Sequence, residues 1–144
     1  MRAVRVTFLG LLASLACGGE AAEDELELRQ LWLETAPQQY VAKVCSTGFI
    51  ARTCTVSAVS AGQAVATQVQ LSGSAWEDVD PAIDVVEGLL NAATREAEDG
   101  CERRVTQHEA YAFPSRVYSD CGEEGWGIEV SCFAADTLEL ARCR

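Results

Sequence analysis

The sequence has few of the residues and motifs that most enzymes use. Its 144 residues include one histidine, His108, so any Ser-His-Asp or Cys-His catalytic arrangement would depend on that side chain. The nucleophile pattern Gly-x-Ser-x-Gly and the phosphate-binding pattern Gly-x-x-x-x-Gly-Lys are both missing. His108 lies between Gln107 and Glu109 in an expected strand, which predicts an exposed histidine. A small hydrolase or metal-dependent enzyme using His108 with nearby carboxylates is therefore the alternative reading, and we assign no catalytic residue.

The apolar run at the start of the chain is too short to span a membrane. Val6–Ala16 contains no charged residue but has only eleven residues, whereas a membrane-spanning helix needs about 20. Arg2 and Arg5 precede this run, and the run ends in small residues of the kind that a signal peptidase recognises. We therefore interpret residues 1–16 as an export leader.

The residues after this leader resemble the bacterial lipoprotein signal, in which a cysteine becomes the lipid-modified first residue. Cys17-Gly18-Gly19 carries the resemblance, which implies a palmitate-bearing diacylglyceryl anchor on Cys17. Two acyl chains would hold the protein durably on a membrane, so we expect an outer-membrane lipoprotein facing the periplasm or the exterior. Ser14 stands where that class usually has leucine. Cleavage after Ala16 and release as a secreted protein is the alternative.

The number of cysteines agrees with an acylated Cys17. Seven is an odd number, and assigning one cysteine to lipid leaves six that can pair completely. Disulfides persist in exported proteins, and the sequence contains no Cys-x-x-Cys pair of the kind that binds zinc. We therefore expect three disulfides and no metal or cofactor. The six are Cys45, Cys54, Cys101, Cys121, Cys132 and Cys143.

Two expected hairpins rank the possible pairings. Strand-like segments flank a loop that contains Gly48, and others flank the glycine-rich turn Gly122–Gly127. We predict Cys45–Cys54 across the first hairpin, Cys121–Cys132 across the second, and Cys101–Cys143 tying the C-terminal tail back to the sheet.

The mature chain is expected to form one α+β domain over residues 26–144, following an acidic tether over residues 17–25. The spacing of apolar residues, together with the positions of glycine and proline, predicts helices and strands in the order α-β-β-β-α-β-β-β. The strands are expected to form a single antiparallel sheet of five or six strands. The second helix should begin with Asp80 as its cap and Pro81 in its first turn. The expected helices are Leu26–Ala36 and Asp80–Gly100; the expected strands are Gln39–Ser46, Arg52–Ser60, Ala64–Leu71, Cys101–Glu109, Ser115–Ser119 and Gly127–Ala134.

A wider resemblance covers about Leu28 to Phe133. Trp32, Tyr40 and the first two mature cysteines, followed by the segment Tyr111–Val117 and then Asp120, resemble an uncharacterised family of small bacterial envelope lipoproteins. Ala112 and Phe113 depart from the family's Gly-Tyr at those positions. The resemblance implies a fold and a location only.

Charge narrows the possible partners. Removal of Arg2 and Arg5 from the 11 basic residues leaves 9 against 22 acidic ones, a net charge of −13. Nucleic acid is then excluded as a partner, because phosphate binding needs a basic footprint. The acidic groups near Asp80 and at Glu123-Glu124 lack the pattern of a calcium loop, and capping or solvation explains them.

One aromatic residue suggests a protein contact. Trp126 follows two glutamates in the glycine-rich turn, where an aromatic side chain on a rigid support would contribute contact area at little entropic cost. The alternative is that Trp126 folds back over the core. We therefore predict a membrane-tethered, non-catalytic module that binds or inhibits an envelope or extracellular protein.

Overall fold

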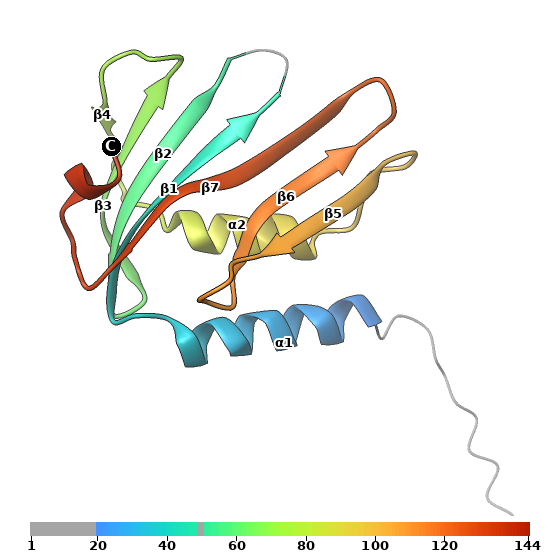
Figure 1. Ribbon diagram of the computed structural model, residues 1–144, viewed down its shortest axis with the longest axis horizontal. Coiled ribbons are helices and arrows are strands. Elements are labelled where there is room, and N and C mark those ends of the chain that lie inside the picture. The colour runs from blue at the N-terminus through green and yellow to red at the C-terminus, as the bar shows by residue number, and fades with distance from the viewer. Residues whose placement is uncertain (1–19, 49–50) are drawn as a thin grey trace, which may run out of the picture.

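The computed structural model describes residues 20–48 and 51–144, with side chains from Glu27 onward. The expected leader over residues 1–16 and the expected lipidation site Cys17 lie outside the described residues. All strands of the described part form one antiparallel sheet in the order β4-β3-β2-β1-β7-β6-β5 (Figure 1). The α+β class is confirmed, and the sheet has seven strands, more than the five or six expected.

The elements follow the predicted order, apart from one short strand, β4, that the sequence pattern did not indicate. They are α1 (Glu20–Thr35), β1 (Gln39–Thr47), β2 (Thr53–Ser60), β3 (Gln63–Leu71), β4 (Glu77–Asp78), α2 (Val85–Thr94), β5 (Glu102–Gln107), β6 (Pro114–Asp120), β7 (Gly125–Ala135) and a 3-10 turn, η1 (Leu140–Arg142).

Helix α1 begins six residues earlier than expected. Glu20–Glu25, predicted as part of the tether, belong to the helix. Alanine and glutamate have high helix propensity, and acidic residues in the first turns favour the positive end of the helix dipole. The sequence of this segment therefore specifies a helix, whereas its polarity had suggested a solvated spacer.

Helix α2 is shorter than expected at both ends. Its cap is Asp84, which accepts hydrogen bonds from the N–H groups of Val86 and Glu87, whereas Asp80 had been predicted for that role. The hydroxyl group of Thr67 is hydrogen-bonded to both the N–H and the carbonyl of Ile83, which keeps the chain extended up to that point. At the other end the helix stops at Thr94, so residues 95–100 form a loop before β5.

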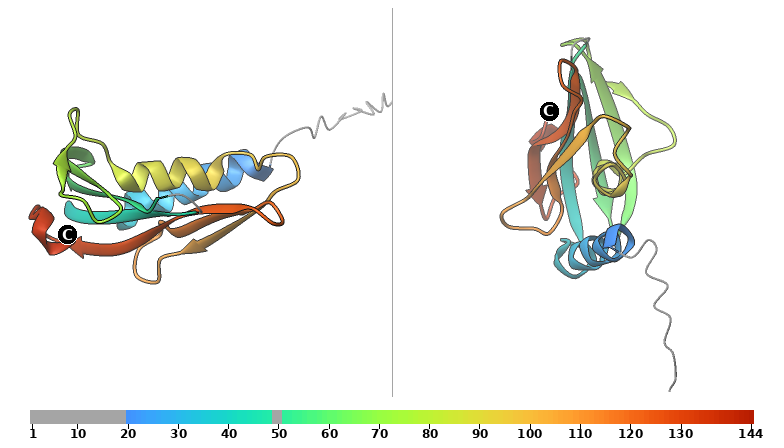
Figure 2. Two further views of the ribbon diagram at one scale, coloured as in Figure 1. Left: turned by 90° about the horizontal axis from the view of Figure 1, so that it is seen from above. Right: turned by 90° about the vertical axis from the view of Figure 1, so that its right-hand side faces the viewer.

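The two faces of the sheet are covered by different parts of the chain. Helix α2 lies across β6, β1 and β2 on one face, and α1 lies beside it on that same face (Figure 2). There the buried Trp32 of α1 makes edge-to-face contacts with Tyr40 and Phe113, with ring centroids 5.5 and 5.1 Å apart. The C-terminal segment covers part of the other face, where Cys143 packs on Val41.

The disulfides agree with one predicted pair and contradict two. Cys45–Cys54 joins directly opposed residues of β1 and β2, as predicted. The other bonds are Cys101–Cys121 and Cys132–Cys143, so the predicted pairs Cys121–Cys132 and Cys101–Cys143 are wrong.

The hairpin register explains why the predicted pairs do not form. The β6–β7 turn is tight, because Cys121 donates its N–H to the carbonyl of Glu124. Cys132 lies seven residues further along β7 than Gly125, at a rise of about 3.4 Å per residue, and is out of reach of Cys121. Cys121 instead lies opposite Cys101, one step beyond the last paired residues of β5 and β6, with Cα atoms 4.1 Å apart.

Half of the glycine-rich segment, Gly125–Gly127, belongs to strand β7, and its two glycines leave room for one aromatic ring. A Cβ atom on Gly127 would lie 2.9 Å from the ring of Tyr118 and 2.8 Å from the hydroxyl of Thr47. A Cβ atom on Gly125 would also meet Tyr118. Tyr118 therefore lies flat on β7 only because these positions carry no side chain.

We expect Gly127→Ala to lower the free energy of unfolding by about 1–3 kcal/mol, because the added methyl group overpacks this contact. The matched control is Gly88→Ala in α2, where a Cβ atom has nothing within 4 Å and alanine should stabilise the helix by about 0.5–1 kcal/mol. Chemical denaturation of both variants measures the difference. Equal stabilities for the two variants would contradict the packing of Tyr118 on Gly127.

Candidate functional site: a groove between the helices and strand β5

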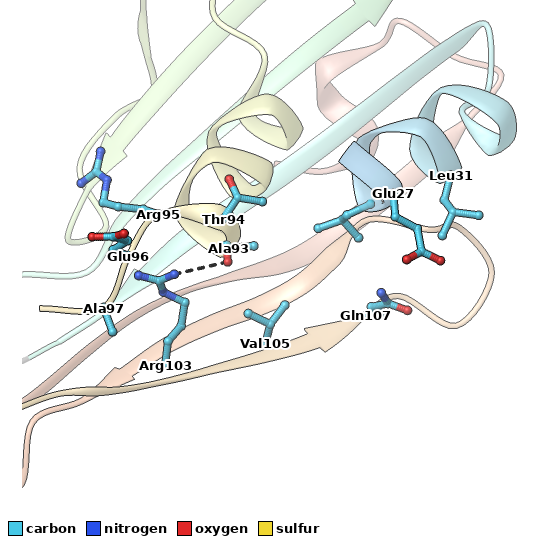
Figure 3. A pocket seen from close by; sticks show the side chains of 11 residues that line it. Glu27, Leu31, Ala93, Thr94, Arg95, Glu96, Ala97, Arg103, Val105 and Gln107 are labelled. Carbon is cyan, nitrogen blue, oxygen red and sulfur yellow. Dashed lines mark hydrogen bonds between the residues drawn. The ribbon is translucent and has the colours of Figure 1, made fainter. Parts of the chain in front are cut away.

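A groove opens where the helices stop short of the sheet edge. Because α2 ends at Thr94, it packs on β6, β1 and β2 and leaves most of the helix-facing side of β5 uncovered. The resulting groove has a volume of about 710 Å³, within the range of small-molecule and peptide sites (Figure 3). Its apolar lining comes from Leu28 and Leu31 of α1, Ala93 of α2 and Val105 of β5.

Two arginines lie along this groove. Arg103 reaches from β5 toward the end of α2 and donates a hydrogen bond to the carbonyl of Ala93 (3.4 Å) (Figure 3). Arg95 lies in the loop after α2, and Glu27 and Glu96 also line the groove. Among the described residues, no carboxylate lies within ion-pair distance of Arg95 or Arg103. The groove thus combines apolar walls with two cationic groups in an acidic chain.

Trp126 lies in strand β7, next to the groove, and not on the tip of the turn as expected. It is opposite Ser119 of β6, which is in turn opposite Arg103 of β5, so these three side chains form one row across the helix-facing side. A second hollow of about 370 Å³, which shares Arg103 with the groove, is lined by Trp126 and by Asn91 of α2. The contact role of Trp126 stays a prediction.

The exposed apolar side chains of this region were not recognised as a set from the sequence. Leu31, Val105 and Trp126 are 39, 41 and 42 % exposed, although each faces inward from its helix or strand. Leu31 and Val105 line the groove and Trp126 lines the adjoining hollow, and half-exposed apolar residues gathered in this way are typical of a surface completed by a partner. The alternation of Arg103, Val105 and Gln107 along β5 was the available signal. This alternation identifies a groove only when it is known that α2 ends at Thr94.

His108 is part of an aromatic cluster. Its ring stacks on Phe113 with centroids 4.7 Å apart and lies 5.8 Å from Phe133. Its Nδ1 accepts hydrogen bonds from the backbone N–H groups of Ala110 and Tyr111. In the part of the chain that the structure describes, no carboxylate is hydrogen-bonded to His108. The hydrolase alternative, which requires such a carboxylate, stays an untested prediction.

Two acidic side chains of the group near Asp80 have structural contacts of their own. Asp78 accepts a hydrogen bond from Gln68 across the β3–β4 pair, and Asp84 caps α2. Within residues 20–48 and 51–144, no three histidine, cysteine or acidic side chains are grouped closely enough to hold a metal ion. Nor does any helix in this part of the chain have the length and apolar character needed to cross a bilayer.

Buried Tyr40 and partly buried Asp84 form a hydrogen-bonded pair that joins β1 to the cap of α2. The Tyr40 hydroxyl donates to both carboxylate oxygens of Asp84, at 3.0 and 3.1 Å. Burial raises the pKa of Asp84, while the hydrogen bonds from Tyr40 and from the helix N–H groups oppose this rise. Burial, and then the negative charge of Asp84, raise the pKa of Tyr40 well above its ordinary value.

Comparison of the chain with protein-family models, curated proteins and solved structures finds no significant match. The lipoprotein signal and the wider family resemblance therefore remain predictions, and the fold and the groove carry the functional argument.

The Tyr40–Asp84 pair predicts a stability loss at alkaline pH. Because the pKa of Tyr40 is higher in the folded chain, the folded protein keeps a proton that the unfolded chain begins to lose near its ordinary pKa of 10.0. The free energy of unfolding should therefore fall as the pH rises above this value. Tyr40→Phe should be about 1–2 kcal/mol less stable at neutral pH, because Asp84 loses a hydrogen bond, but should lose less stability above pH 10. Urea denaturation across this range tests the prediction, and parallel curves for the two proteins would contradict it.

Proposed function

We propose that this chain is an exported bacterial envelope protein, attached to the membrane through Cys17, whose folded part is a non-catalytic module that binds an envelope or extracellular protein. The observation that carries the binding role is the groove beside β5, where Leu31 and Val105 are half-exposed, together with the adjoining hollow, where Trp126 is half-exposed.

Export is supported by the cysteine chemistry. All six cysteines of the described part are paired in disulfides. Such pairs persist in exported proteins and are rare in the reducing cytosol. The leader over residues 1–16 accounts for export, and acylation of Cys17 would account for the one cysteine outside these pairs.

A binding role for the groove is supported by its composition. Apolar side chains at its centre contribute contact area, and charged side chains at its rim orient the partner, as in many protein interfaces. The net charge of −13 without the leader disfavours nucleic acid and anionic lipid headgroups as partners. A protein partner fits these features best.

The helix α1 offers a matched pair of variants that tests this function. Leu31 lines the groove, whereas Leu33 is 78 % exposed and lies outside it. We expect Leu31→Glu to lose most of the partner cross-linked to the wild-type protein in its native envelope, because a carboxylate at this position would be desolvated on binding. Leu33→Glu should retain the partner. Quantitative mass spectrometry of the cross-linked complexes measures both.

Thermal melting of both variants checks that they fold. The two variants are a matched pair because each adds one negative charge to the same helix. Equal retention of the partner by the two variants, or its absence from wild-type protein, would contradict the proposed function.

A further inference from the structure

The inference that follows rests on the proposed function and concerns the chemistry of the partner. Strand β5 is an edge of the sheet, because the order β4-β3-β2-β1-β7-β6-β5 ends with it. An edge strand leaves backbone N–H and C=O groups without a neighbouring strand. Which residues of β5 present these groups follows from the register.

The orientation of β6 fixes the orientation of β5. Cys121 donates its N–H to Glu124, so its backbone groups point toward β7 and away from β5. Backbone direction alternates along a strand, so Ser119 and Val117 have the same orientation. The short Cα separation of 4.1 Å between Cys121 and Cys101 agrees, because close spacing is typical of pairs that are not hydrogen-bonded to each other.

Ser119 and Val117 lie opposite Arg103 and Val105 of β5. Arg103 and Val105 are therefore also in non-hydrogen-bonded pairs, and their N–H and C=O groups point toward the open edge. These are the same two residues whose side chains line the groove. One segment thus offers backbone hydrogen-bonding groups at its edge, with an apolar and a cationic side chain on one face.

We propose that an extended segment of a partner protein binds by adding an eighth strand alongside β5. Its backbone bonds to Arg103 and Val105, and its helix-facing side chains enter the groove beside Leu31. A strand places opposed side chains in direct contact, so the segment carries an acidic residue opposite Arg103 and an apolar residue opposite Val105. These two residues are separated by one position whether the added strand is parallel or antiparallel.

Charge favours this occupant over a second copy of the chain. Arg103 has no carboxylate within ion-pair distance among the described residues, so a single acidic side chain complements it. Two copies of the chain, each with a net charge of −13 without the leader, repel each other. Pairing β5 with itself so that Arg103 meets Val105 would also place Arg104 opposite Arg104.

The test uses short random linear peptides displayed on phage and selected on the oxidised, folded protein. Two variants of Val105 separate the contribution of its backbone to peptide binding from that of its side chain. Val105→Pro removes an N–H that points to the open edge, which an edge strand tolerates, whereas Val105→Ala shortens the side chain and keeps the N–H. Thermal melting of both variants confirms that they fold.

We expect the enriched peptides to share an acidic and an apolar residue separated by one position. They should bind Val105→Pro about tenfold or more weakly than Val105→Ala, because the proline removes a hydrogen bond and obstructs the added strand. Binding should also slow hydrogen exchange at the amides of Arg103 and Val105. Equal affinity for the two variants, or no peptide enriched on the wild-type protein, would overturn the proposal.

Two further outcomes separate this proposal from the proposed function. If the partner cross-linked in the envelope is lost from Leu31→Glu but retained by Val105→Pro, the groove binds the partner and strand addition is wrong. If the purified protein dimerises and Val105→Pro abolishes the dimer, the occupant is a second copy, and the proposal of a partner segment fails.

Discussion

The pairing of β1 with β7 is the contact on which the rest of the structure depends. The chain forms two sets of antiparallel strands, β1 to β4 and β5 to β7, and only the β1–β7 ladder joins them into one sheet. This ladder closes a loop of most of the domain, so its formation has a large entropic cost. The aromatic contact between Tyr40 and Phe133, which stack with centroids 5.3 Å apart across the ladder, helps to offset that cost. The register shift between Lys43 and Val44 divides the ladder into two regular parts.

The groove is a consequence of how the two sets of strands are covered. The ten-residue helix α2 packs on β6, β1 and β2 and ends before it covers the last strand, β5. Strand β5 therefore has little buried area of its own, and most of its side chains are exposed. The Cys101–Cys121 bond compensates for this lack of packing on β5. A disulfide stabilises a folded protein by about 2–4 kcal/mol because it restricts the unfolded chain. A strand that is fixed at one end and open at its edge can bind a partner without first folding.

The sequence predicted what depends on local pattern. Alternation placed six of the seven strands within a few residues, and the loop at Gly48 identified the hairpin that Cys45–Cys54 closes. Features set by long-range contacts were not predictable in this way. The choice of Asp84 as the cap of α2 depends on its contact with Tyr40, and the Cys132–Cys143 bond depends on the tail folding over the far face of the sheet. The groove was missed for the same reason, because Val105 is exposed only as a result of α2 ending before it covers β5.

The proposed function requires that an exported, oxidised domain is attached to the envelope through one cysteine and binds a partner through an edge strand that a disulfide fixes. Mass spectrometry of non-reduced peptides, from protein isolated from membranes of its native host, tests it most directly. The account predicts three linked pairs, Cys45–Cys54, Cys101–Cys121 and Cys132–Cys143, and a first peptide that begins at an acylated Cys17. Free thiols at the six paired positions, or an unprocessed chain that begins at Met1, would contradict it.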